Sequence, residues 1–236
     1  MDFAKHSKHI SSLIKSYGAT SALSHIVHQG LNKILFLKVF RGMTLTQTSL
    51  HPEFRSLPSE YECRFLVPHE VAQYAADPAL DLPDEFLLSE ARDAQCCGVF
   101  HGGELVSYGW YSTKPVRAFA GADLSFDPSY TYMFRGFTRE SHRGKQLHAY
   151  GMAWALLHYA SVGQKGLISY VESTNFASLR SVARLGYEIF GSLIALKLFG
   201  RLIVIPSGKC SDYSFTLTPE GTASLAQVHV QNRKAA

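Results

Sequence analysis

Residues 130–147 read YTYMFRGFTRESHRGKQL. The first part, residues 130–137, is rich in aromatic side chains, which is typical of a central strand. Residues 138–145 are polar and charged, and apolar side chains return at helical spacing over residues 146–162. The segment therefore predicts a strand, a charged loop and a helix in direct succession.

A second unit of the same kind follows this helix. Residues 163–166 contain two glycines that stop it, and the apolar run at 167–171 predicts a buried strand. Residues 173–185 return to helical spacing, and Gly186 is placed to end that helix as a left-handed cap. Two consecutive βα units predict a mixed α/β (α+β) fold.

The flanking elements are predicted by the same rules of spacing and turn chemistry. Upstream we expect a strand at 60–65, helices at 68–76 and 83–91, a hairpin of strands 96–100 and 104–111, and irregular chain at 114–127. Downstream we expect a hairpin of strands 190–198 and 202–205, a last strand at 210–217, and a frayed tail.

The chain is expected to consist of a helical and basic N-terminal arm, residues 1–60, a main domain, residues 61–225, and a flexible tail, residues 226–236. Within the arm, residues 7–29 have helical spacing. Residues 31–46 fit either a helix that runs into a strand or one long strand. Their basic side chains also fit contact with an anionic membrane surface, although a buried strand is the favoured interpretation.

Composition narrows the class of protein. A chain of 236 residues with 46% hydrophobic residues can bury one substantial core, and its net charge of +4 is spread along the sequence, so we expect no nucleic-acid partner. The four cysteines lack metal-ligand spacing, which favours reduced thiols in a cytoplasmic protein without a bound metal. No secretory signal and no apolar run of about 20 residues that could span a bilayer is recognised.

The charged loop has the residue types of a phosphate site. A loop that leads from a strand into a helix presents free N–H groups and the positive end of the helix dipole. Gly144 permits close approach of the backbone, while Arg143 and Lys145 can contact phosphate oxygens. A solvated turn is the alternative interpretation for such a short motif.

Two anchors in these βα units resemble the GNAT (GCN5-related N-acetyltransferase) superfamily. The aromatic strand with Ser141-His142-Arg143-Gly144-Lys145-Gln146 is similar to the superfamily's acyl-CoA motif, Q/R-x-x-G-x-G/A. Asn175, Ser178 and Gly186-Tyr187 are similar to its later pattern of Asn, a small residue and Gly-Phe. The resemblance covers about the last two-thirds of the chain and implies a mostly antiparallel central sheet flanked by helices.

The resemblance also implies a donor site for acetyl-CoA or another acyl-CoA, without a metal. The backbone amides of Arg143, Gly144, Lys145, Gln146 and Leu147 are expected to hold the CoA pyrophosphate. The main chain of Phe137 and Thr138 is expected to pair with the pantetheine arm, and Asn175 and Ser178 to contact the cofactor. Capping of its own helix is the alternative role for Asn175.

The sequence departs from the superfamily pattern in two places. Ser141 and Gln146 stand at the ends of the loop motif, and Val182 stands where many members carry a tyrosine that protonates the leaving thiolate. We therefore expect Glu172 to act as general base, unless it only pairs with Arg180 or faces solvent, and one of Tyr130, Tyr132 and Tyr170 to replace the missing acid, with Tyr132 and Tyr170 preferred. His142 and His148 are further candidates.

The implied activity is transfer of an acyl group, most simply acetyl, from CoA to an amine of a small molecule or a protein. A longer acyl chain, a carrier-protein donor or a catalytically silent CoA-binding module are the alternatives. The basic arm is expected to be able to contact an acidic carrier or a membrane surface. The sequence leaves the oligomeric state open.

Overall fold

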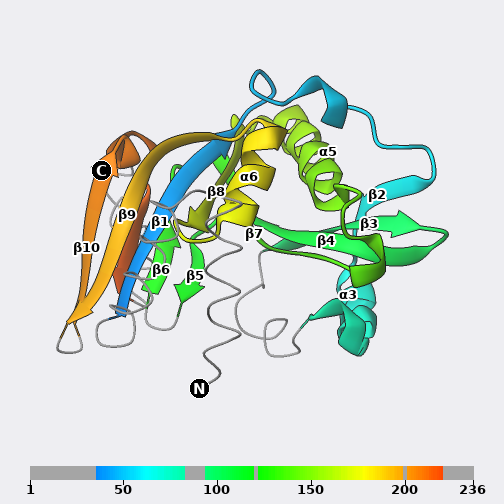
Figure 1. The fold of residues 1–236 in the computed structure, drawn as a ribbon, viewed down its shortest axis with the longest axis horizontal. Coiled ribbons are helices and arrows are strands. Elements are labelled where there is room, and N and C mark those ends of the chain that lie inside the picture. The colour runs from blue at the N-terminus through cyan, green and yellow to red at the C-terminus, as the bar shows by residue number, and fades with distance from the viewer. Residues whose placement is uncertain (1–35, 83–93, 120–121, 199–200, 220–236) are drawn as a thin grey trace, which may run out of the picture.

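The computed structural model describes residues 36–82, 94–119, 122–198 and 201–219 (Figure 1). These residues form an eight-stranded sheet in the order β10-β9-β1-β8-β7-β4-β3-β2 and a three-stranded sheet in the order β11-β6-β5. The large sheet contains β1 (Phe36–Leu45), β2 (Tyr61–Phe65), β3 (Gln95–His101), β4 (Glu104–Ser112), β7 (Tyr130–Thr138), β8 (Gly166–Glu172), β9 (Glu188–Leu198) and β10 (Arg201–Gly208). The small sheet contains β5 (Val116–Phe119), β6 (Ala122–Ser125) and β11 (Thr216–Pro219), and the helices are α3 (Pro68–Ala75), α5 (Leu147–Ser161) and α6 (Phe176–Leu185).

The predicted mixed α/β class with a mostly antiparallel central sheet is confirmed. Among the described strands of the large sheet, β7 and β8 are the one parallel pair, and every other neighbouring pair is antiparallel. Strand β7 reaches β8 through α5, and β8 continues into α6, as the two βα units predict. Gly186 ends α6 in the left-handed conformation with φ 112°.

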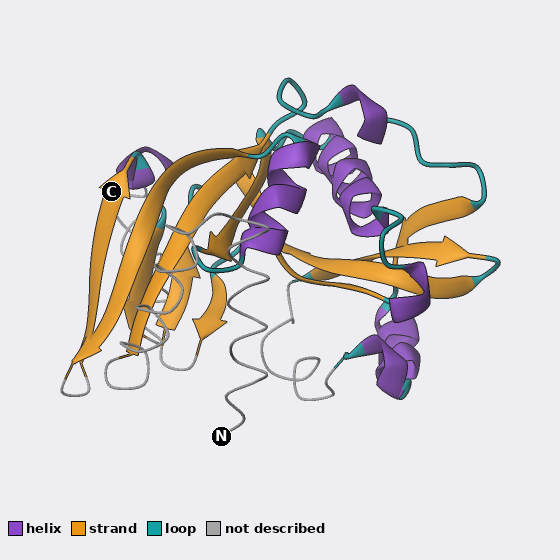
Figure 2. Cartoon of the chain, viewed as in Figure 1, coloured by secondary structure: helices purple, strands orange, loops and turns teal. Residues whose placement is uncertain are grey.

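Helix α5 covers one face of the sheet (Figure 2). Its sequence is apolar on nearly every side, so it is buried against the strands rather than amphipathic at the surface. Ala153, Ala155 and Leu156 are fully buried in one core cluster with Met43 and Leu167 of the sheet. This packing fixes the N-terminus of α5 at the end of β7.

The opposite face of β8, β1 and β9 is covered by the small sheet. Phe40 and Tyr132 pack there in a second core cluster with Leu124 and Phe215. The prediction of irregular chain at 114–127 is wrong, because β5 and β6 form a short antiparallel pair in it. The last predicted strand, 210–217, is also too long: residues 210–213 form a 3-10 turn and β11 follows.

Residues 31–46 were expected to form either a helix that runs into a strand or one long strand. The structure describes residues 36–46 of this segment. Phe36–Leu45 is a strand, and it lies between β8 and β9, antiparallel to both. Residues grouped in sequence with the arm therefore belong to the middle of the sheet, and a boundary at residue 60 does not separate them from it. The physical reason is that both faces of β1 are covered, which suits its apolar run.

Several sequence predictions fall outside the described residues: the helices at 7–29 and 83–91 and the tail from 226. Among the helices that the structure does describe, none combines the length and apolar character needed to span a bilayer. The four cysteines are buried free thiols, and burial raises the pKa of the Cys63 thiol to about 12.

Candidate functional site

The two parallel strands separate soon after they begin. Strands β7 and β8 pair only from Tyr130↔Gly166 to Tyr132↔Ile168. One residue further, the Ser169 hydroxyl donates to the Met133 carbonyl at 2.8 Å, so a side chain replaces the next backbone bond. Beyond this point the facing edges of the strands are no longer paired with one another, and a cleft opens between them.

A bulge on β7 borders this cleft. Tyr108 lies opposite Phe137 and Trp110 opposite Phe134, so β7 has one residue more than β4 over this stretch. Arg135 takes up the extra length with a φ of 49°, which is unusual for a residue other than glycine. The bulge turns the main chain of residues 134–136 away from regular pairing, at the cleft.

A cavity of about 270 Å³ occupies the opening. We call it the cleft cavity. It is lined by residues 132–136 of β7, residues 169–171 of β8, His148 and Met152 of α5, Ser178, Ser181 and Val182 of α6, and Tyr187.

The charged loop leads from this cleft into α5. Gly144 has a φ of 83° and a Cβ there would meet no atom within 4 Å, so the loop backbone is open to solvent. Gln146 precedes the helix with a φ of 59° and provides no side-chain cap. For the amides of residues 144–148 the hydrogen bonds of the described chain include no acceptor. They lie at the positive end of the α5 dipole, where an anion is stabilised.

The side chains of the loop are also available to an anion. Arg143 and Lys145 are exposed. Arg143 Nε makes only a long 3.4 Å contact to the Thr138 carbonyl. Arg143, Gly144, Lys145, Gln146 and Leu147 lie at the N-terminus of α5, but the Arg143 amide already donates to the Glu140 carbonyl at 3.2 Å, so the amides left for an anion begin at Gly144.

Phe137 and Thr138 lie between the cleft and the loop. One of the backbone groups predicted to pair with the pantetheine arm already has a hydrogen-bond partner in the protein. The Phe137 carbonyl accepts a hydrogen bond from Ser107 Oγ at 2.7 Å. The Phe137 ring stacks on Tyr108 at 5.7 Å and packs against the core cluster that contains Tyr108. The neighbouring residues 133–136 line the cleft cavity instead, so the strand edge nearest a ligand lies slightly earlier in β7 than predicted.

Asn175 caps α6. Its side-chain oxygen accepts a hydrogen bond from the Ser178 amide at 3.1 Å, which is the alternative role considered for it. The cap does not exclude contact through the Asn175 amide group. Ser178 itself lines the cleft cavity, in the first turn of α6.

Tyr132 and Tyr170 face each other across the cleft. Their rings stack with centroids 6.1 Å apart, and the Tyr170 hydroxyl donates to the Ala118 carbonyl at 3.3 Å. Burial raises the pKa of both phenols. Both line the cleft cavity, so each can keep its proton at neutral pH beside a bound ligand.

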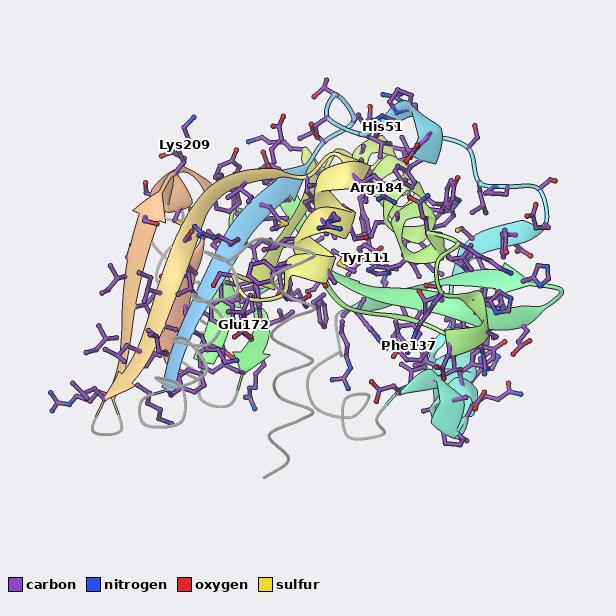
Figure 3. All side chains as sticks on the ribbon, viewed as in Figure 1. His51, Tyr111, Phe137, Glu172, Arg184 and Lys209 are labelled. Atoms are coloured by element: carbon purple, nitrogen blue, oxygen red, sulfur yellow. The ribbon has the colours of Figure 1, made fainter. Side chains whose placement is uncertain are left out.

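Glu172 lies just outside the lining of the cleft cavity. Its two oxygens accept hydrogen bonds from Lys38 Nζ at 2.9 and 2.8 Å, and each side chain is 29% exposed. Glu172 is therefore paired, with Lys38 of β1 as the observed partner. Figure 3 shows Glu172 on the β1 side of the cleft and Phe137 on the α3 side.

The two histidines differ in position. His142 lies on the short turn before the loop, where its ring contacts that of His101. His148 belongs to the first turn of α5 and lines the cleft cavity. Although it keeps some exposure, protein atoms crowd its ring, and this desolvation lowers its pKa to about 4 against an opposing hydrogen bond to the Tyr108 backbone. His148 is neutral at physiological pH.

The cleft cavity contains residues that the sequence analysis did not select: Gly136, Ser181 and Tyr187. An isolated glycine inside a strand is a known sign of a bulge, so Gly136 was detectable. The Tyr187 hydroxyl donates to the Met152 sulfur at 3.9 Å. Val182 does face the cleft cavity, so the position predicted to carry the acid is correctly placed but apolar.

No model of a known family and no curated protein matches this sequence. Similar solved structures include a GCN5-related N-acetyltransferase from Kribbella flavida, 16% identical over 75% of this chain, with a TM-score of 0.46. They also include a GNAT-family acetyltransferase from Colwellia psychrerythraea, 17% identical over 72% of this chain, with a TM-score of 0.46. The matches span 63% and 60% of those proteins, less than two thirds of their length. Both come from the superfamily that the sequence motifs of this chain resemble.

Proposed function

We propose that this protein is an acyl-CoA-dependent N-acyltransferase that moves a short acyl group, most simply acetyl, to a primary amine. The observation that carries the proposal is the cleft between β7 and β8, which opens beside a helix terminus with free amides. An acyl-CoA matches that combination, because it joins a thioester to a long anionic CoA moiety. The CoA pyrophosphate binds at the loop, and the thioester lies in the cleft.

The donor is held in two places. The pyrophosphate of CoA accepts hydrogen bonds from the amides of residues 144–148, and Arg143 and Lys145 neutralise its charge. The pantetheine arm runs along the unpaired edge of β7 at residues 133–136 and packs against Val182 of α6. The thioester then lies between the strands, near Tyr132 and Tyr170.

The size of the cleft cavity supports a short acyl group. At about 270 Å³ it lies below the roughly 300–1,000 Å³ of sites that enclose a drug-sized ligand. Met133, Met152 and Tyr187 close it with apolar and aromatic surface. Because these side chains narrow the space beside the thioester, we expect rates to fall as the acyl chain lengthens.

Two proton transfers accompany the reaction. The amine must lose a proton before it attacks, and the carboxylate of Glu172, one residue beyond Val171 of the cavity lining, is the proposed acceptor. The departing CoA thiolate must gain a proton, and the phenols of Tyr170 and Tyr132 are neutral donors that line the cleft cavity. Neutral His148 adds no positive charge of its own to the lining of the cleft cavity.

Release of free thiol tests the proposal. Purified protein is incubated with acetyl-, butanoyl- or octanoyl-CoA and a panel of primary amines, and CoA thiol is followed with a chromogenic reagent. The proposal expects amine-dependent thiol release that is fastest with acetyl-CoA. Absence of release with every donor and acceptor, despite binding, would contradict enzymatic function.

The second candidate is a module that binds acyl-CoA without turnover. It is favoured by Val182 at the position of the expected acid and by the Lys38 ion pair that occupies Glu172. The same experiment separates the two, because a silent module raises its melting temperature with CoA but releases no thiol.

A further inference from the structure

The ion pair between Lys38 and Glu172 lies at the rim of the cleft. Lys38 Nζ contacts both carboxylate oxygens, at 2.9 and 2.8 Å. Glu172 directly follows Val171, and both Tyr170 and Val171 line the cleft cavity. Because a strand rises about 3.3 Å per residue, the carboxylate belongs to a residue only one step from the cavity wall.

Lys38 reaches this place because β1 is inserted beside β8. The register sets Phe40 opposite Glu172, and Lys38 lies two residues away on the same face of β1. The Phe40 ring packs edge-on against Tyr170 at 4.6 Å and stacks on Phe119 at 5.9 Å. The chain thus carries a primary amine, on a flexible stem, at the aromatic rim of its own cleft.

The Glu172 carboxylate also affects Tyr170, which lines the cleft cavity. The negative charge of Glu172 contributes to the raised pKa of Tyr170, so the carboxylate and the phenol are electrostatically coupled. The ion pair thus places an amine next to a proton acceptor, and Phe40, on the same strand as Lys38, packs against Tyr170, a proton donor that lines the cleft cavity. These are the groups that an amide-forming transfer requires.

We propose that Lys38 is itself an acyl acceptor, so that the protein acylates its own Lys38 Nζ from the bound acyl-CoA. This inference rests on the proposed function, since it requires an acyl-CoA in the cleft. The Lys38 ammonium gives one proton to Glu172, and the neutral nitrogen attacks the thioester carbonyl carbon. The C–N bond forms, the C–S bond breaks, the nitrogen loses its second proton, and the thiolate takes up one, so that one proton is released in total.

Acylation changes the rim. An acylated Lys38 is uncharged and no longer holds Glu172 in an ion pair, so the carboxylate becomes free to bind the ammonium of a second acceptor. Before self-acylation the Glu172 carboxylate is paired with the amine of Lys38. After it, the carboxylate can pair with the amine of an external acceptor.

Lys165 is a matched control within the chain. It forms an ion pair with Asp127 at 3.7 Å and its side chain is 63% exposed, more than twice the exposure of Lys38. It precedes β8 at the end opposite to Glu172. Uncatalysed acylation in solution favours the more exposed amine, whereas transfer within the cleft favours Lys38.

The experiment follows site-resolved acylation by mass spectrometry of digests, after incubation of the full chain with acetyl-, butanoyl- or octanoyl-CoA. With the preferred donor we expect Lys38 to be modified at least about tenfold faster than Lys165, a difference of about 1.4 kcal/mol in activation free energy. The rate per molecule should not depend on protein concentration. Glu172→Gln should slow modification of Lys38 without changing CoA binding, and Lys38→Arg should abolish it while keeping the charge.

The outcomes distinguish this inference from the proposed function. If CoA raises the melting temperature and external amines release thiol, but Lys38 is modified no faster than Lys165, the inference is wrong and the proposed function stands. If no acyl-CoA binds, both are wrong. A rate of Lys38 modification that rises in proportion to protein concentration would indicate transfer between molecules and would also overturn the inference.

Discussion

His148 occupies the space that a side chain at position 136 would need. A Cβ added to Gly136 would overlap three atoms of the His148 imidazole, Cε1, Nε2 and Nδ1. The ring therefore packs directly on the backbone of the β7 bulge and joins the first turn of α5 to the cleft. Glycine on the strand and histidine on the helix are a complementary pair.

Gly136→Ala should consequently displace His148 and weaken both the fold and CoA binding. Overpacking of this kind costs about 1–3 kcal/mol, which denaturant unfolding can measure. The double variant Gly136→Ala/His148→Ala should recover most of the loss, because the overlapping ring is gone. Gly109→Ala is a graded comparison with a smaller expected loss, since a Cβ there would lie 3.4 Å from the same ring and 3.3 Å from Met133 and Tyr111. Equal losses in the single and double variants would show that the ring is not the cause.

The loop glycine can be tested against a glycine with the same backbone requirement. Gly144 and Gly163 have φ values of 83° and 97°, and neither has an atom within 4 Å of an added Cβ. Replacement of either by leucine should cost about 1–2 kcal/mol of stability through backbone strain alone. Only Gly144→Leu should abolish CoA affinity in a calorimetric titration, because Gly163 lies beyond the far end of α5. Equal CoA affinities in the two variants would contradict the assignment of the loop as the pyrophosphate site.

The depressed pKa of His148 predicts a loss of stability in mild acid. Its pKa is about 4 in the folded protein against an ordinary value of 6.5, so its contribution to stability is complete above pH 6.5 and is lost as the pH falls through 4. The expected loss is about 2–3 kcal/mol. Chemical denaturation between pH 7 and 4 should show a shallower fall for His148→Gln than for the natural chain. Parallel curves for the two proteins would contradict a buried neutral histidine.

Tyr170 should protonate the leaving thiolate over a wide range of pH. Burial raises its pKa above the ordinary value of 10, so the acid stays protonated as the pH rises and the rate should not fall on the alkaline side below pH 10. Tyr170→Phe should lower kcat about 10²–10⁴-fold with little change in CoA affinity. Tyr130→Phe serves as control, because Tyr130 lies on the paired part of β7 outside the cleft cavity lining. Equal effects of both changes would indicate a packing role.

The tandem βα units were predictable because their signals are local. The spacing of apolar residues, the glycine stop at 163–166 and the cap at Gly186 all act within a few residues, and each has its counterpart in the structure. The hairpin at His101-Gly102-Gly103 was readable for the same reason: both glycines take positive φ values there.

Long-range pairing was not predictable from such signals. Nothing near Phe36–Leu45 indicates that it enters the sheet between β8 and β9, because that choice depends on partners more than 120 residues away in the sequence. The same limit applies to the ion-pair partner of Glu172. Arg180, on the next helix, was the partner considered from the sequence, whereas the structure pairs Glu172 with Lys38 of β1. The short strands β5 and β6 escaped detection because four residues carry too little pattern.

Amide hydrogen exchange in the presence and absence of CoA tests the central claim most directly, since it locates the ligand without requiring turnover. The account predicts that saturating CoA slows exchange at residues 144–148, whose amides donate to the pyrophosphate, and at residues 133–136 along the edge of β7. The Gly144→Leu variant should show neither effect. Binding of CoA that leaves the exchange of both segments unchanged, or protection confined to another part of the chain, would contradict the account.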